Sequence, residues 1–114
     1  MADKPVVWVG SSLQVVRTFP ADARRAAGYE LRRVQSGLMP CDHKPLSSVG
    51  IGVLEIRIHT RSEHRIVYLA KFEDAVYVLH AFEKRSRKTS QADLALARDR
   101  LAHVRTLRRK SKER

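Results

Sequence analysis

The stretch from residue 54 to residue 84 limits the fold most strongly, because it is dense in β-branched and aromatic residues. It opens with Leu-Glu-Ile-Arg-Ile-His over 54–59, in which apolar and polar residues alternate as in a half-buried strand. Segments 65–72 and 75–84 follow, and only Glu73 and Asp74 separate them. This spacing predicts a hairpin, although no glycine marks its turn. Three consecutive strands therefore form the expected centre of the domain.

Helices are expected on both sides of this stretch in the sequence. Residues 6–9 predict a short strand, and Gly-Ser-Ser at 10–12 offers an N-cap for a short helix through Phe19. Pro20 suits the first turn of a second helix, and Gly37 suits its end. One apolar stripe runs along that helix: Ala23, Ala27, Leu31, Val34 and Leu38. Residues 39–52, with two prolines and two glycines, are expected to be a loop.

The last helix is predicted to begin at Ser90, where Ser-Gln-Ala-Asp resembles a capping box. Its apolar stripe consists of Leu94, Ala97, Leu101 and Val104. The order of elements predicts one α+β domain over residues 1–114, with the helices packed on one face of a sheet. Residues from about 105 to 114 are basic and are expected to form a frayed tail.

Charge is the abnormal part of the composition. The 114 residues carry a net charge of +11 at pH 7, and the sequence pI is near 10.7. Up to Glu83 the chain has 11 basic and 9 acidic residues, whereas from Lys84 onward it has 12 and 3. Such a surplus favours a polyanionic partner, first of all nucleic acid. A solvated basic helix end is the alternative explanation for the last residues.

Alternation along the strands points to a cationic patch. If the strand faces align, five residues surround one concave surface: Arg57, Arg65, Lys71, His80 and Lys84. Gathered cations bind phosphate, and their mutual repulsion lowers a lysine pKa toward values useful for base chemistry. Arg65 and Lys84 are expected to project from the sheet into solvent. The alternative is a set of ordinary charged strand ends, with His80 hydrogen-bonded in place.

Other chemistry is poorly represented. Cys-Asp-His at 41–43 contains three kinds of metal ligand, but no nearby residue completes a zinc site, so no metal or other cofactor is expected. No nucleophile signature or glycine-rich phosphate loop is present. A single cysteine, no signal-peptide pattern and no apolar run of membrane length predict a cytoplasmic protein without membrane contact.

Several segments, in this order, resemble the phage-derived, HigB-type branch of the RelE/ParE toxins. They are Trp-Val-Gly-Ser-Ser at 8–12, Leu-Glu-Ile-Arg at 54–57, Arg-Ile-Val-Tyr at 65–68 and Leu-His-Ala-Phe-Glu-Lys-Arg at 79–85, with Lys-Thr at 88–89. The resemblance covers nearly the whole chain. It implies a microbial-RNase-like RelE fold: a small, mainly antiparallel sheet with two N-terminal helices and a C-terminal helix.

The resemblance also implies roles for individual residues. Arg65 matches the arginine that grips the scissile phosphate, Lys84 with Arg85 matches a Lys-Arg pair at the end of the last strand, and His80 fits the HigB-type pattern. The implied catalytic residues are Arg65, His80 and Lys84, with either His80 or Lys84 exchanging protons. The expected RNA-binding residues are Lys44, Arg57, Lys71, Arg85 and Lys88. Unlike RelE itself, this chain has no aromatic residue after Phe82.

The function implied is that of a type II toxin that enters the ribosome and cleaves mRNA without a metal, by attack of the ribose 2′-OH. The implied partner is a cognate helix-turn-helix antitoxin of the HigA type. The toxin is expected to reach operator DNA only through this antitoxin. Trp8 and Leu13 are candidate anchors for it. The alternatives are a non-catalytic toxin of the ParE kind and a basic module that binds ribosomes or DNA.

Overall fold

A computed structural model describes residues 3–112. Five strands form one sheet in the order β1-β5-β4-β3-β2. They are β1 (Val6–Trp8), β2 (His43–Pro45), β3 (Val53–His59), β4 (Glu63–Leu69) and β5 (Val76–Lys84). β1 runs parallel to β5, and the other neighbouring strands are antiparallel. The expected α+β class with a mainly antiparallel sheet is confirmed.

Three helices accompany the sheet: α1 (Ser12–Arg17), α2 (Ala21–Gln35) and α3 (Gln91–Lys112). Gly37 follows α2 with φ 88°, and Ser90 caps α3 by accepting the Asp93 N–H at 3.0 Å, both as predicted. The segment expected to fray is helical from residue 105 to Lys112, and residues 113–114 lie outside the described part. No helix within residues 3–112 is long and apolar enough to cross a membrane.

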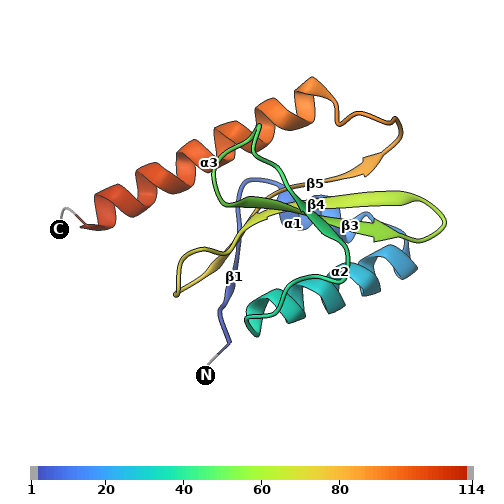
Figure 1. Cartoon of the computed structure of the whole chain (residues 1–114), viewed down its shortest axis with the longest axis horizontal. Coiled ribbons are helices and arrows are strands. Elements are labelled where there is room, and N and C mark those ends of the chain that lie inside the picture. The colour runs from blue at the N-terminus through green and yellow to red at the C-terminus, as the bar shows by residue number, and fades with distance from the viewer. Residues whose placement is uncertain (1–2, 113–114) are drawn as a thin grey trace.

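The helices lie on both faces of the sheet, so the expectation of a single covered face is wrong. α2 and α3 flank the sheet from opposite sides (Figure 1). The first core joins α1 and α2 to side chains such as Ile66 and Tyr68, and the second joins α3 to side chains such as Val67 and Leu69. Adjacent residues of β4 thus enter different cores, because successive strand side chains point to opposite faces.

A β-bulge in β5 changes which residues share a face. Val67 pairs with His80 while Tyr68 pairs with Val78, so Leu79 is the extra residue. Val78 consequently belongs to the core under α1 and α2, whereas Leu79 belongs to the core under α3. Strict alternation along β5 would put Val76 and Val78 on the face of His80 and Lys84, but the bulge places the two valines on the opposite face. After the bulge, Ala81 belongs to the core under α1 and α2, and Phe82 belongs to the core under α3.

Two boundaries also differ from the sequence prediction. β2 lies inside the expected 39–52 loop and pairs with β3 through His43–Ile56 and Pro45–Leu54. Three residues are too few to show a periodic pattern. The hairpin connection is longer than two residues, because β4 ends at Leu69 and β5 begins at Val76.

Gly10 allows the tight passage from β1 into α1. Its φ is 58°, and a Cβ there would lie 2.6 Å from Nε of Arg100. Arg100 of α3 donates hydrogen bonds to the Leu79 carbonyl at 3.0 Å and to the Ser11 hydroxyl at 2.9 Å. The glycine therefore leaves room for the arginine that links α3 to the N-terminal turn.

Candidate functional site

Four cationic side chains meet on the face of the sheet that carries α3. Arg57 of β3 lies directly opposite Arg65 of β4, and Lys44 of β2 lies opposite Glu55 of β3. Lys84, the last residue of β5, is close enough for the charges of the other three to act on its amine. We call Lys44, Arg57, Arg65 and Lys84 the cation cluster. The structure thus brings together four of the eight residues expected in the site.

Arg65 is buried in this cluster and does not project into solvent as expected. It is 3% exposed, and its Nη1 donates to Glu63 Oε1 at 3.1 Å and to the His64 carbonyl at 3.0 Å. Its Nε lies 3.6 Å from Glu55 Oε1. Two strand neighbours and a carboxylate from the adjacent strand therefore hold the guanidinium in one orientation.

Glu55 lies beneath the cluster and was not singled out from the sequence. It is fully buried, and its Oε1 is 3.6 Å from Arg65 Nε and 3.9 Å from Lys44 Nζ. Neither carboxylate oxygen has a hydrogen-bond partner among the described residues. A buried carboxylate in this position is stabilised by the surrounding positive charges. The available signal was its place two residues before Arg57 on the same strand face.

Lys84 has the most altered environment of the cluster's lysines. Burial lowers the pKa of its amine first, and the positive charge of Arg65 lowers this pKa further. Lys44 and Arg57 act in the same direction, whereas Glu55 opposes them. A larger share of Lys84 is therefore neutral at a given pH than for an ordinary lysine.

Two members of the cluster, Arg65 and Lys84, line a shallow pocket of about 350 Å³ that is open to solvent. Its lining residues are Glu63, Arg65, Lys84, Arg85, Ser86 and Arg87. A second pocket of about 140 Å³ also borders Lys84 and extends to Lys88 and Asp93. Lys84 thus separates two adjoining hollows, and the expected residues Arg85 and Lys88 line them.

His80 faces the same way but is covered by α3. Its Nε2 lies 2.7 Å from Asp93 Oδ1, and Arg100 Nη1 lies 3.4 Å from its Nδ1. The ring also stacks on Phe82, with centroids 5.3 Å apart. Each ring nitrogen therefore faces a partner from α3. With 6% of the residue exposed, His80 links the sheet to α3 and has little open surface.

Lys71 is not part of the cluster. It follows β4 at the strand end remote from Arg65, six residues away, which corresponds to roughly 20 Å of extended chain. Its amine lies 5.2 Å from the Phe72 ring centroid, in a cation–π contact. The expected patch of five residues is therefore split, with Lys71 at the opposite end of the hairpin.

An ion-pair network borders the cluster at the β3–β4 turn. His59 Nδ1 lies 2.7 Å from Glu63 Oε1, and its Nε2 lies 2.5 Å from Asp42 Oδ2. The hydrogen bond with Asp42, followed by that with Glu63, raises the pKa of His59. Asp42 also lies 4.0 Å from Arg57 Nη1. This network ties β2, β3 and β4 together beside the cations.

Comparison with known proteins identifies the family. The model of the family described as "Phage derived protein Gp49-like (DUF891)" matches residues 14–102, which include both N-terminal helices in large part, β2 to β5 and the first half of α3. Among curated proteins there is no match. The matched segment contains the whole cation cluster. The chain therefore belongs to the phage-derived Gp49-like proteins, a branch of the RelE/HigB-like toxin family.

Proposed function

We propose that this toxin-family protein is an endoribonuclease that cleaves mRNA on the ribosome and so inhibits translation. The observation that supports the proposal best is the cation cluster, two of whose members, Arg65 and Lys84, line an open pocket, and whose Lys84 has a lowered pKa. A phosphodiester is an anion that such a cluster attracts. A surface used only for binding gains nothing from lowering the pKa of one of its lysines.

The reaction proposed is attack of a ribose 2′-OH on the adjacent phosphate. A bond forms between the 2′ oxygen and phosphorus, and the bond between phosphorus and the 5′ oxygen breaks. The products are a 2′,3′-cyclic phosphate and a free 5′-OH, because the proton taken from the 2′-OH is returned to the departing 5′ oxygen. Arg57 and Arg65 stabilise the charge on the five-coordinate phosphorus, a role suited to groups fixed in advance. Glu55 and Glu63 position the Arg65 guanidinium for it.

Lys84 is the group we propose for proton transfer, in preference to His80. Both ring nitrogens of His80 already face partners from α3, and the ring is covered. The Lys84 amine lies at the pocket, and its lowered pKa provides more of the neutral form that accepts the 2′-OH proton. Lys44, Arg85 and Lys88 bind neighbouring phosphates of the RNA.

The proposed partners follow from the same role. An antitoxin is expected for a member of this family. We propose that it is a helix-turn-helix protein of the HigA type, that it alone contacts operator DNA, and that the toxin acts in the cytoplasm. Substrate mRNA and the ribosome are the remaining partners.

The test is cleavage of a translated mRNA by purified protein, mapped by primer extension. Lys84→Ala is expected to lower the cleavage rate by about 10²- to 10³-fold, within the range found for acid–base groups. Arg65→Lys, which keeps the charge that Glu55 needs, is expected to lower it by a similar factor because the planar guanidinium is lost. Lys110→Ala, on the exposed end of α3, is the control.

A pH profile separates the roles. In the wild-type protein the rate is expected to rise with pH until it passes the lowered pKa of Lys84, below the ordinary value of 10.5, and then to level off. Lys84→Arg is expected to abolish this rise. Ribosome binding without any cleavage, by a well-folded wild-type protein, would reject the enzyme in favour of a binding toxin.

A further inference from the structure

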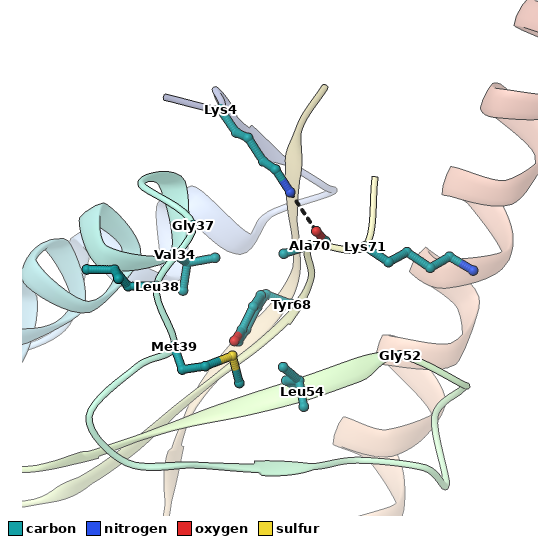
Figure 2. A pocket seen from close by; sticks show the side chains of 10 residues that line it. All are labelled: Lys4, Val34, Gly37, Leu38, Met39, Gly52, Leu54, Tyr68, Ala70 and Lys71. Atoms are coloured by element: carbon teal, nitrogen blue, oxygen red, sulfur yellow. Dashed lines mark hydrogen bonds between the residues drawn. The ribbon is translucent and has the colours of Figure 1, made fainter. Parts of the chain in front are cut away.

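A cavity lies on the face of the sheet opposite the cation cluster. It has a volume of about 310 Å³ and lies between the end of α2 and strands β3 and β4. Figure 2 shows Val34, Met39, Leu54 and Tyr68 gathered around it, with the Tyr68 hydroxyl beside the Met39 side chain. Tyr68 and Arg65 are three positions apart on β4 and point to opposite faces. A ligand in this cavity therefore leaves the cation cluster open.

The cavity combines an apolar interior with apolar residues at its border. Met39 is 49% exposed and Ile51, next to the lining residue Gly52, is 85% exposed. Leu38 was predicted to continue the buried stripe of α2, but it is 53% exposed because α2 ends at Gln35. Adjacent half-exposed apolar residues around one hollow are typical of a protein-binding surface.

The charged residues that line the cavity, Lys4 and Lys71, are both positive. Lys4 lines the cavity and donates to the Ala70 carbonyl at 2.7 Å, and Arg33 donates from Nε to the Met39 carbonyl at 3.1 Å. None of the lining residues, all within the described part of the chain, carries a carboxylate. Two copies of a chain with a net charge of +11 repel each other, so an acidic partner is favoured over self-association.

We propose that this cavity binds the antitoxin, which inserts an apolar side chain between Met39 and Leu54 and places acidic residues near Lys4 and Arg33. The proposal rests on the toxin assignment, which supplies an antitoxin as the partner. The Tyr68 hydroxyl, whose pKa burial raises to about 12, lies beside Met39 and is available as a donor to the inserted segment. The antitoxin then holds the toxin without occupying its cation cluster.

The test uses the full chain and the purified product of the adjacent open reading frame as the probe. Met39→Asp removes an exposed apolar contact and adds a negative charge facing an acidic partner. It is expected to weaken binding about 10- to 100-fold in isothermal titration calorimetry, as loss of one central anchor does. Leu107→Asp on α3 is the matched control, since Leu107 is 52% exposed, belongs to the helix on the other face of the sheet and does not line the cavity. It is expected to bind as the wild type does.

Each other outcome overturns the inference. The inference is rejected if Met39→Asp binds the probe with wild-type affinity. It is also rejected if Leu107→Asp weakens binding equally, or if the probe does not bind the wild-type chain. Conversion of a wild-type dimer to a monomer by Met39→Asp, measured by light scattering, would assign the cavity to a second copy. RNA cleavage by Met39→Asp is measured in parallel and is expected to be unchanged. Absence of cleavage in all variants, with the binding pattern intact, would reject the proposed enzyme and keep this interface.

Discussion

Arg65 and Lys84 carry like charges in adjacent strands, but their surroundings give them different capacities. Arg65 is buried between Glu55 and Glu63 and has one orientation. Lys84 lies at the pocket, and its amine is discharged more easily than usual. A fixed cation stabilises developing charge, whereas a lysine with a lowered pKa gives up its proton more readily than an ordinary lysine and can take part in proton transfer. The surroundings of Arg65 and Lys84, more than their residue types, therefore distinguish the two proposed roles, which are charge stabilisation and proton transfer.

His59 gives a prediction about stability at this scale. Its raised pKa means that the folded state binds the proton more tightly than the unfolded chain does. The stabilisation is therefore fully present below pH 6.5, the ordinary value, and is lost as pH rises through the raised pKa. The contribution is below about 1 kcal/mol, because the ring and both carboxylates are partly exposed.

The variant that checks this is His59→Gln, with His103→Gln on the exposed surface of α3 as the control. Thermal unfolding is followed over a pH series. The difference in Tm between wild type and His59→Gln is expected to be largest on the acid side and to shrink toward alkaline pH. A difference that grew with pH would contradict the ion-pair network.

At the scale of elements, periodicity predicted the parts of the chain that repeat regularly. Alternation over 54–59 assigned the faces of β3, and the 3-4-3 stripe of α3 matches its buried residues Ala97, Leu101 and Val104. The bulge at Leu79 was not predictable, because the residues on both sides of Leu79 are largely apolar and the extra residue leaves no visible break in the pattern. It nevertheless exchanges the two faces of the strand for the residues on one side of it. Five of the expected site residues lie on strands: Lys44, Arg57, Arg65, His80 and Lys84. Lys71 was misplaced because β4 ends before it.

The close approach of the 46–52 loop to α3 gives a second prediction, which compares two glycines. A Cβ on Gly50 would clash with Cδ2 of the buried Leu101, whereas a Cβ on Gly28, inside α2, meets nothing within 4 Å. Gly50→Ala is expected to lower the free energy of unfolding by about 1–3 kcal/mol. Gly28→Ala is expected to raise it by about 0.5–1 kcal/mol, because alanine favours the helix.

Urea unfolding of the two variants measures this directly. Each substitution adds one methyl group, so the pair controls for composition. Stabilisation by Gly50→Ala would show that the loop moves away from α3 without cost. Destabilisation by Gly28→Ala would show that the outer surface of α2 is covered.

In the whole molecule, the basic residues that form the cation cluster come from both halves of the sequence, although most of the net positive charge follows residue 83. Arg100 and Arg108 of α3 are engaged internally, the first with Leu79 and Ser11 and the second with Asp74 and Tyr77. Cations from β2 and β3, which precede residue 83, complete the cluster. The fold thus mixes the two halves of the sequence in one site.

The third prediction concerns salt. If the partly exposed members Lys44, Arg57 and Lys84 each contact a phosphate of single-stranded RNA, they contribute about −2 to the slope of the logarithm of affinity against the logarithm of salt concentration. Lys44→Ala is expected to reduce the steepness by about 0.7. Arg109→Ala, at the exposed end of α3, is the control. Fluorescence anisotropy with a labelled RNA between about 50 and 200 mM salt provides the slopes.

A slope near zero would show that these side chains do not neutralise phosphates. An equal change of slope with Arg109→Ala would move the RNA from the cation cluster to α3.

The pairing of β1 with β5 has a consequence for how the protein is made. Val6 lies beside Val76, so the first strand of the chain finds its place in the sheet only after the last strand has been synthesised. Pairing over such a sequence distance closes a large loop and is slow compared with helix formation. The second core and Lys84 also depend on this late stage. Most of the polypeptide has therefore left the ribosome before the sheet is complete, and the finished toxin forms only late in its own synthesis.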